Sequence, residues 1–133
     1  FDPKHALEFE FRRKRGAHLF SKHRFLAAQI QSYLTEDLWL SMAKSSNDAC
    51  SRLVQGLHKI SDVQINFEPQ ANIIFAHWSR AAHQRLHAAG AQYYVLEGDY
   101  TAGPADELLP ARLVTDWSAT AKNVDKFLNI LRG

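Results

Sequence analysis

The chain has 133 residues, of which 46% are hydrophobic and 23% are charged, and its net charge at pH 7 is +2. This is the length of one ordinary domain, with enough apolar residues for a buried core. No apolar run approaches the roughly 20 residues of a membrane-spanning helix, and the small net charge gives no argument for nucleic-acid binding. The single cysteine, Cys50, has no partner for an internal disulfide, which is typical of a cytoplasmic protein.

Positive charge is concentrated near the beginning of the chain. Residues 1–59 carry ten Lys and Arg against six Asp and Glu, whereas residues 60–133 carry six against eight. Most of the excess lies in the run from Arg12 to Arg15, and Lys22 and Arg24 follow soon after. Such a run is ordinarily a solvated face, but it also suits a small anion such as phosphate.

The first helix is predicted from the residues at its two ends. Asp2 is a favourable N-cap and Pro3 a favourable first helical residue. Gly16 is typical of a residue that ends a helix, so the helix is expected to end at about Arg15. Residues 17–22 then form a connector.

Two further helices are predicted after the connector. Residues 23–34 place apolar side chains on one stripe, and Thr35 resembles a cap for a long third helix over about 36–59. Glu36 and Asp37 would then occupy its first turn, where the helix dipole favours acids. The apolar positions of this third helix are Leu38, Met42, Ala49, Leu53 and Leu57.

The second half of the chain changes to the alternating period of strands. Ser79 and Thr120 are suitable N-caps for two helices in this half. We expect strands at 63–67, 72–78, 92–96 and 111–118, helices at 80–89 and 121–131, and a loop over 97–110. This order predicts an α+β fold in which a sheet of about four strands is covered by helices on one face.

Histidines and tryptophans give weaker indications. His83 and His87 are four residues apart on a predicted helix, so a metal site is geometrically possible, but no third ligand is evident. We therefore expect surface histidines and no metal. Trp39, Trp78 and Trp117 are expected to be core or interface anchors.

Arg112 is the candidate binding residue because of where it lies. In the predicted final strand, Leu113, Thr115 and Trp117 point to one face, and Arg112, Val114 and Asp116 point to the other. A guanidinium on a mostly apolar segment needs an anionic partner, because a lone buried charge is very costly. That partner is either a local acid such as Asp116, or water, or the carboxylate of a substrate, which the planar fork fits by two parallel hydrogen bonds.

Three segments together resemble the threonine aldolases of low specificity in the β-eliminating lyase/threonine aldolase family. They are residues 1–29, the long helix that follows Leu34, and the run Arg112–Trp117. The resemblance covers essentially the whole chain and corresponds to the C-terminal part of those enzymes. It implies a small C-terminal α+β domain of an aspartate-aminotransferase-type (fold type I) enzyme, preceded by linking helices. Residues 1–22 would link to a large domain, and residues 23–133 would form the small domain.

The resemblance also implies a function. Family members use pyridoxal 5′-phosphate to cleave β-hydroxy-α-amino acids, such as L-threonine and L-allo-threonine, to glycine and an aldehyde, and they are homo-oligomers, dimers or tetramers. Arg112 would hold the substrate α-carboxylate. Lys14 and Lys22 would approach the cofactor phosphate of a neighbouring subunit, a role that Arg13, Arg15 and Arg24 would share unless they form subunit salt bridges. The Schiff-base lysine lies upstream of this chain, so the 133 residues alone are expected to be inactive.

Two other interpretations remain open from the sequence. One is β-elimination by an enzyme of the same superfamily, in which Arg112 has the same role. The other is a non-enzymatic α+β binding module that uses the basic helix as its docking face. The residues that precede Phe1 in the gene would distinguish them.

Overall fold

The computed structural model describes residues 2–133, so Phe1, the first residue of the resembling segment, lies outside the described part of the chain. The chain divides into two compact units, one up to Leu38 and one from Trp39 to the end. The boundary expected between residues 22 and 23 concerns the domains of a larger enzyme, and it stays a prediction.

The first unit consists of short helices. They are η1 (Pro3–His5), α1 (Ala6–Arg15), α2 (His23–Leu34) and η2 (Thr35–Asp37). The Asp2 carboxylate accepts a hydrogen bond from the Lys4 N–H at 3.0 Å, so the predicted cap is confirmed, although it starts a 3₁₀ turn. The second helix has the bounds predicted from the sequence. No residue described in this unit is buried.

The third helix, α3 (Leu38–Leu57), begins later than predicted. Glu36 and Asp37 have φ values of 52° and 55° and belong to the η2 turn. Left-handed residues cannot continue a right-handed helix. The prediction that these two acids occupy the first turn of the long helix was therefore wrong.

The second unit contains a four-stranded antiparallel sheet with the order β1-β2-β4-β3. The strands are β1 (Gln64–Ile65), β2 (Ile73–Ser79), β3 (Tyr94–Val95) and β4 (Leu108–Val114). The number of strands and the α+β class are confirmed. The outer strands are shorter than predicted, and β4 extends from Leu108 to Val114 and not from 111 to 118.

Pro110 explains why the start of β4 was misplaced. A proline usually ends a central strand because it has no N–H to donate, so residues 108–110 were predicted to be loop. The Pro110 carbonyl accepts a hydrogen bond from the Leu96 N–H at 2.9 Å, just past the end of β3. The nitrogen and carbonyl of one strand residue point to the same side. The missing N–H therefore faces the end of the two-residue β3, and the pairing with β2 is intact.

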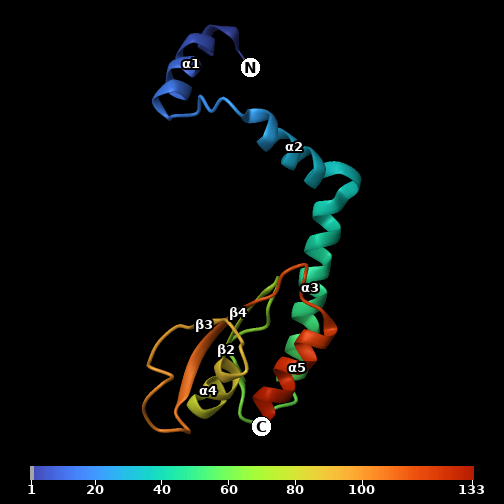
Figure 1. Ribbon diagram of the computed structural model, residues 1–133, viewed down its shortest axis with the longest axis vertical. Coiled ribbons are helices and arrows are strands. Elements are labelled where there is room, and N and C mark those ends of the chain that lie inside the picture. Colours follow the sequence, from blue (N-terminus) through green and yellow to red (C-terminus); the bar gives the residue numbers. More distant parts are fainter. Residues whose placement is uncertain (1) are drawn as a thin grey trace. The chain divides into compact units, whose positions relative to one another are not determined.

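Helices α3, α4 (Arg80–Ala88) and α5 (Ala121–Arg132) cover one face of this sheet, as Figure 1 shows. Both predicted caps are present, because the Ser79 Oγ accepts from the Ala82 N–H and the Thr120 Oγ1 accepts from the Asn123 N–H. The core contains apolar residues of all three helices and of the two long strands: Leu53, Leu57, Ile74, Ala76, Trp78, Leu86, Ala111, Leu113, Val124 and Leu128. The prediction of helices on one face is confirmed. Within residues 2–133, no helix has both the length and the apolar character needed to cross a membrane.

The histidine and tryptophan predictions have mixed outcomes. Trp78 is a core residue, whereas Trp117 is 61% exposed and Trp39 is 39% exposed. His83 is fully buried, so its assignment to the surface was wrong. Its Nδ1 lies 2.8 Å from the Tyr93 hydroxyl and its Nε2 lies 3.1 Å from the Leu109 carbonyl, which lets the ring remain neutral inside the core.

Candidate functional site

The face of the sheet opposite the helices is open. Its side chains alternate with the core residues along β2 and β4, and each is half-buried or exposed. We call this surface the open face. In these two strands it consists of Ile73, Phe75, His77, Leu108, Pro110, Arg112 and Val114.

Arg112 lies within this open face. It is the fifth residue of β4, not near the start of the strand as predicted. Its neighbours in register are Phe75 on β2 and Tyr94 on β3. Directly opposed residues of antiparallel strands point to the same face. The Arg112 Cζ lies 4.4 Å from the centre of the Tyr94 ring. An aromatic residue therefore stands in register on each side of the guanidinium.

The Arg112 guanidinium has no anionic partner within the described part of the chain. Its Nε is buried without a hydrogen-bond partner, and no ion pair forms at this residue. Asp116, the local acid considered from the sequence, instead accepts hydrogen bonds from the Ser118 N–H at 2.8 Å and the Ser118 Oγ at 2.7 Å. These bonds lower the pKa of the Asp116 carboxyl. A local ion pair with Asp116 is therefore excluded for Arg112 in this structure.

Arg80, in the same unit, differs from Arg112 because its guanidinium is hydrogen-bonded within the fold. Arg80 is 4% exposed, and its Nε donates to the Asp99 carbonyl at 2.8 Å. Its Nη1 donates to the Pro104 carbonyl at 2.5 Å and to the Glu107 carboxylate at 2.7 Å. This guanidinium closes the loop before β4, and its role was missed from the sequence because all three acceptors lie far along the chain. Arg80 therefore stabilises the fold, whereas the Arg112 guanidinium makes no hydrogen bond or ion pair within the described residues.

The free edge of Arg112 defines what the site can bind. Nη1 and Nη2 have no hydrogen-bond partner among residues 2–133, and unlike Nε they are not buried. Two parallel N–H donors in a fixed plane suit the two oxygens of a carboxylate. The open face can therefore hold one carboxylate end-on, beside aromatic and apolar side chains.

Lys14 and Lys22, the residues predicted to approach a phosphate, lie in the first unit. Lys14 is on α1 and pairs with Glu10 at 3.6 Å, with about half of each side chain exposed. Lys22 is the N-cap residue of α2, and no hydrogen bond or ion pair forms at its ammonium within the described residues. Lys14 and Lys22 therefore belong to the first unit, and Arg112 belongs to the second.

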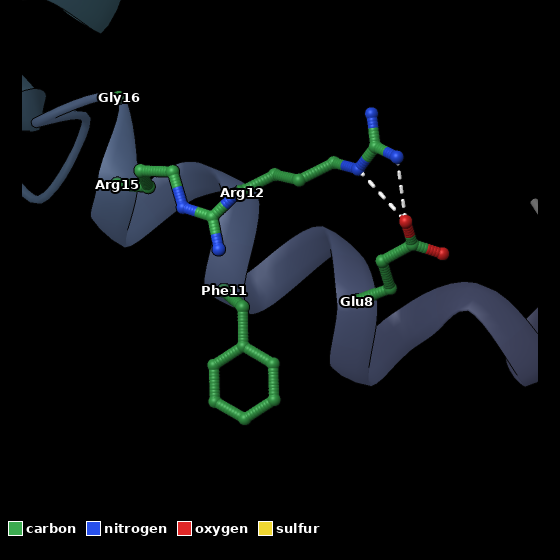
Figure 2. Close-up of a pocket in the computed structure, with 5 residues that line it drawn as sticks. All are labelled: Glu8, Phe11, Arg12, Arg15 and Gly16. Atoms are coloured by element: carbon green, nitrogen blue, oxygen red, sulfur yellow. Dashed lines mark hydrogen bonds and ion pairs between the residues drawn. The ribbon is translucent and has the colours of Figure 1, made fainter.

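The end of α1 is strongly basic but partly neutralised by its own acids. Figure 2 shows the Arg12 side chain reaching back to the Glu8 carboxylate, with hydrogen bonds of 3.0 and 2.6 Å, while Phe11 projects away from that pair. A shallow pocket at this place is lined by residues of one helix and its end: Glu8, Phe11, Arg12, Arg15 and Gly16. Exposed ammonium and guanidinium groups have the chemistry that a phosphate requires. The assignment of Lys14 and Lys22 to a phosphate stays a prediction.

Metal-ion chemistry has no candidate among residues 2–133, where no three His, Cys, Asp or Glu side chains gather. His87, four residues after His83, stacks between Tyr93 and Tyr100 with ring centres 4.6 and 4.2 Å away. Both imidazoles are therefore engaged with aromatic neighbours.

Comparisons with known proteins give two related sequences, and no family model matches the chain. The chain is 33% identical to the low-specificity L-threonine aldolase of Pseudomonas aeruginosa over 94 residues, which is 71% of the chain and 27% of that protein. It is 32% identical to the low-specificity L-threonine aldolase of another Pseudomonas species over 98 residues, 74% of the chain and 28% of that protein. The chain thus spans somewhat more than a quarter of the length of the curated relatives it matches.

Solved structures show the same fold. A threonine aldolase from Leishmania major matches 78% of the chain and 28% of its own, with a TM-score of 0.65 and 19% identity. A cystine C–S lyase solved with cysteine persulfide matches 68% and 23%, with a TM-score of 0.53 and 14% identity. A serine palmitoyltransferase from Sphingomonas wittichii matches 64% and 22%, with a TM-score of 0.50 and 21% identity. These likenesses confirm the predicted fold, which forms a part of fold type I enzymes.

Proposed function

We propose that this chain, a relative of low-specificity L-threonine aldolase, is part of a pyridoxal-phosphate-dependent aldolase. The complete protein would cleave β-hydroxy-α-amino acids such as L-threonine and L-allo-threonine to glycine and an aldehyde. The observation that carries this proposal is the free Nη1/Nη2 edge of the half-buried Arg112. In the same unit the buried Arg80 donates three hydrogen bonds through Nε and Nη1.

Arg112 would bind the α-carboxylate of the amino acid. Two charge-assisted hydrogen bonds from one rigid plane fix both the position and the rotation of the carboxylate. Orientation of this kind lowers the barrier, because the bond to be broken is held in the productive geometry.

Lys14 and Lys22 would hold the phosphate of the cofactor, with Arg13, Arg15 and Arg24 near them as further cations. Pyridoxal phosphate, when bound, supplies the electron sink for cleavage of the bond to the α-carbon. In this proposal the complete protein is a homo-oligomer in which these lysines reach the site of a neighbouring subunit. The 133-residue chain alone would be inactive, because the Schiff-base lysine would come from another part of the complete protein.

The proposal is tested in the complete gene product with pyridoxal phosphate, by measuring aldehyde released from L-threonine. We expect Arg112→Lys to raise KM about 10- to 100-fold, since an ammonium replaces two parallel hydrogen bonds to a charged group by one. Arg132→Gln is the matched control, because this exposed arginine bonds only its helix neighbour Asn129 at 3.3 Å.

An unchanged KM and kcat in Arg112→Lys would remove the carboxylate assignment. Release of a keto acid without an aldehyde would replace the aldolase by a β-eliminating lyase. Failure of the complete product to bind the cofactor at all would favour a non-enzymatic binding module.

A further inference from the structure

Tyr94 is the residue of the open face whose position the fold does not explain. It is 65% exposed and lies on β3, a strand of two residues at the edge of the sheet. A large aromatic ring gains little from packing when two thirds of it remain in water. The contact that the ring does make is with the guanidinium of Arg112.

The register of the sheet brings these two side chains together. Tyr94 is the direct partner of Arg112 across β3 and β4, so both side chains stand on the open face. The Arg112 Cζ lies over the ring at 4.4 Å from its centre, within the range in which the ring quadrupole attracts a cation. On the other side of Arg112, Phe75 occupies the matching position on β2.

We propose that Tyr94 is a positioning residue for Arg112, holding its guanidinium ready to receive the substrate carboxylate through Nη1 and Nη2. This inference rests on the proposed function. A ring attracts the flat face of a guanidinium, while a carboxylate binds in the guanidinium plane. The two interactions therefore do not compete, and the ring remains in place when the carboxylate arrives.

The advantage of this contact is that the Arg112 side chain is already ordered before the substrate carboxylate binds. An arginine side chain has many rotamers, and a free one must be immobilised when its ligand binds, which lowers affinity. Tyr94 restricts those rotamers in advance, and the buried Nε leaves only the Nη1/Nη2 edge available. Loss of the ring should thus weaken carboxylate binding without removing the charge that binds it.

The test uses the complete enzyme and two inhibitors that differ by the carboxylate, glycine and methylamine. We expect Tyr94→Leu to raise KM for L-threonine and Ki for glycine about three- to tenfold, with kcat and the Ki for methylamine unchanged. Tyr94→Phe, which retains the ring, should stay within about twofold of the wild type. Leu96→Ala is the matched control, because Leu96 is another exposed apolar residue beside β3.

Two outcomes would overturn the inference. Wild-type values in Tyr94→Leu would show that the ring does not order Arg112, and equal shifts for glycine and methylamine would show a general structural defect. The double variant with Arg112→Gln should lose the effect of Tyr94→Leu. If Arg112→Gln alone leaves KM unchanged, the proposed function fails together with this inference. If Arg112→Gln raises KM and Tyr94→Leu does not, the positioning role fails alone.

Discussion

The two faces of the sheet are built from the same strands and have opposite properties. On the helix-covered face, Ile74 and Trp78 are at most 1% exposed, whereas on the open face Ile73 is 40% exposed and Val114 is 54% exposed. The covered face joins three helices in one core. The open face contains Arg112, whose guanidinium makes no hydrogen bond or ion pair within residues 2–133. The difference teaches that the residues that stabilise this unit lie on one side of the two strands, whereas the proposed binding residue lies on the other side.

This division follows from the period of a strand. Successive side chains point to opposite faces, so a residue and its neighbour can be substituted with effects on different properties. Neighbouring positions are therefore the natural controls for one another.

The largest effect is expected from Trp78→Ala on the covered face. Trp78 packs against His83, Tyr93 and Phe127 with ring centres 4.9, 5.6 and 6.2 Å away, so truncation leaves a large cavity. We expect the free energy of unfolding to fall by about 3–5 kcal/mol in urea denaturation. His77→Ala, its neighbour on the open face, should cost less than about 1 kcal/mol. Equal losses would contradict the division between the faces.

A smaller effect is expected where α3 meets α5. Gly56 is buried on α3, and a Cβ at this position would overlap the Leu128 side chain of α5. Alanine gains about 1 kcal/mol of helix propensity over glycine, but overpacking a core costs about 1–3 kcal/mol. We therefore expect Gly56→Ala to lower the free energy of unfolding by about 1 kcal/mol. Gln55→Ala, on the exposed side of α3, should not lower the free energy of unfolding. A Gly56→Ala variant that is more stable than the wild type would show that α5 has room to move.

An effect of similar size is expected from a dependence of stability on pH through His83. Burial lowers the pKa of this imidazole from its ordinary value. The hydrogen bond to the Leu109 carbonyl offsets part of this shift, and His87 and Arg80 add to the lowering. Above about pH 6.5 both the folded and unfolded states are neutral at this position. Below that pH the imidazole binds a proton in the unfolded state and stays neutral in the folded state. The free energy of unfolding therefore falls as the pH falls toward the folded pKa.

We expect the difference in His83 protonation to lower the free energy of unfolding by about 1 kcal/mol between pH 7.5 and pH 5.5. The measurement is urea denaturation at the two pH values for the wild type and for His83→Gln. The difference between the two proteins isolates His83 from the exposed histidines. Identical pH dependence in both would mean that water reaches the imidazole in the folded state.

Local signals predicted most of the secondary structure correctly. Ser79 and Thr120 cap their helices by their own side chains, so a few residues are enough to locate the two helix starts. The alternation of Arg112, Leu113 and Val114 likewise assigned each side chain to its correct face. These predictions succeeded because each depends on neighbours in the sequence.

Predictions failed where the deciding partner is distant. Pro110 was taken as a loop residue because the sequence does not show that its nitrogen faces the end of a short strand. His83 was placed on the surface because its acceptor, the Leu109 carbonyl, comes from β4. In the candidate site, Arg112 could be singled out from the sequence, and its proposed role stays a prediction. Tyr94 was not, because only strand pairing brings it opposite Arg112.

Pro110 has a further effect on the candidate site. If β3 slid along β4 by two positions so that Tyr94 stood opposite Pro110, the tyrosine carbonyl would face a ring nitrogen with no hydrogen to offer. A slide of one position would turn Tyr94 to the covered face. In the observed register Tyr94 stands opposite Arg112, which has an N–H, so the pairing beside the guanidinium avoids that loss.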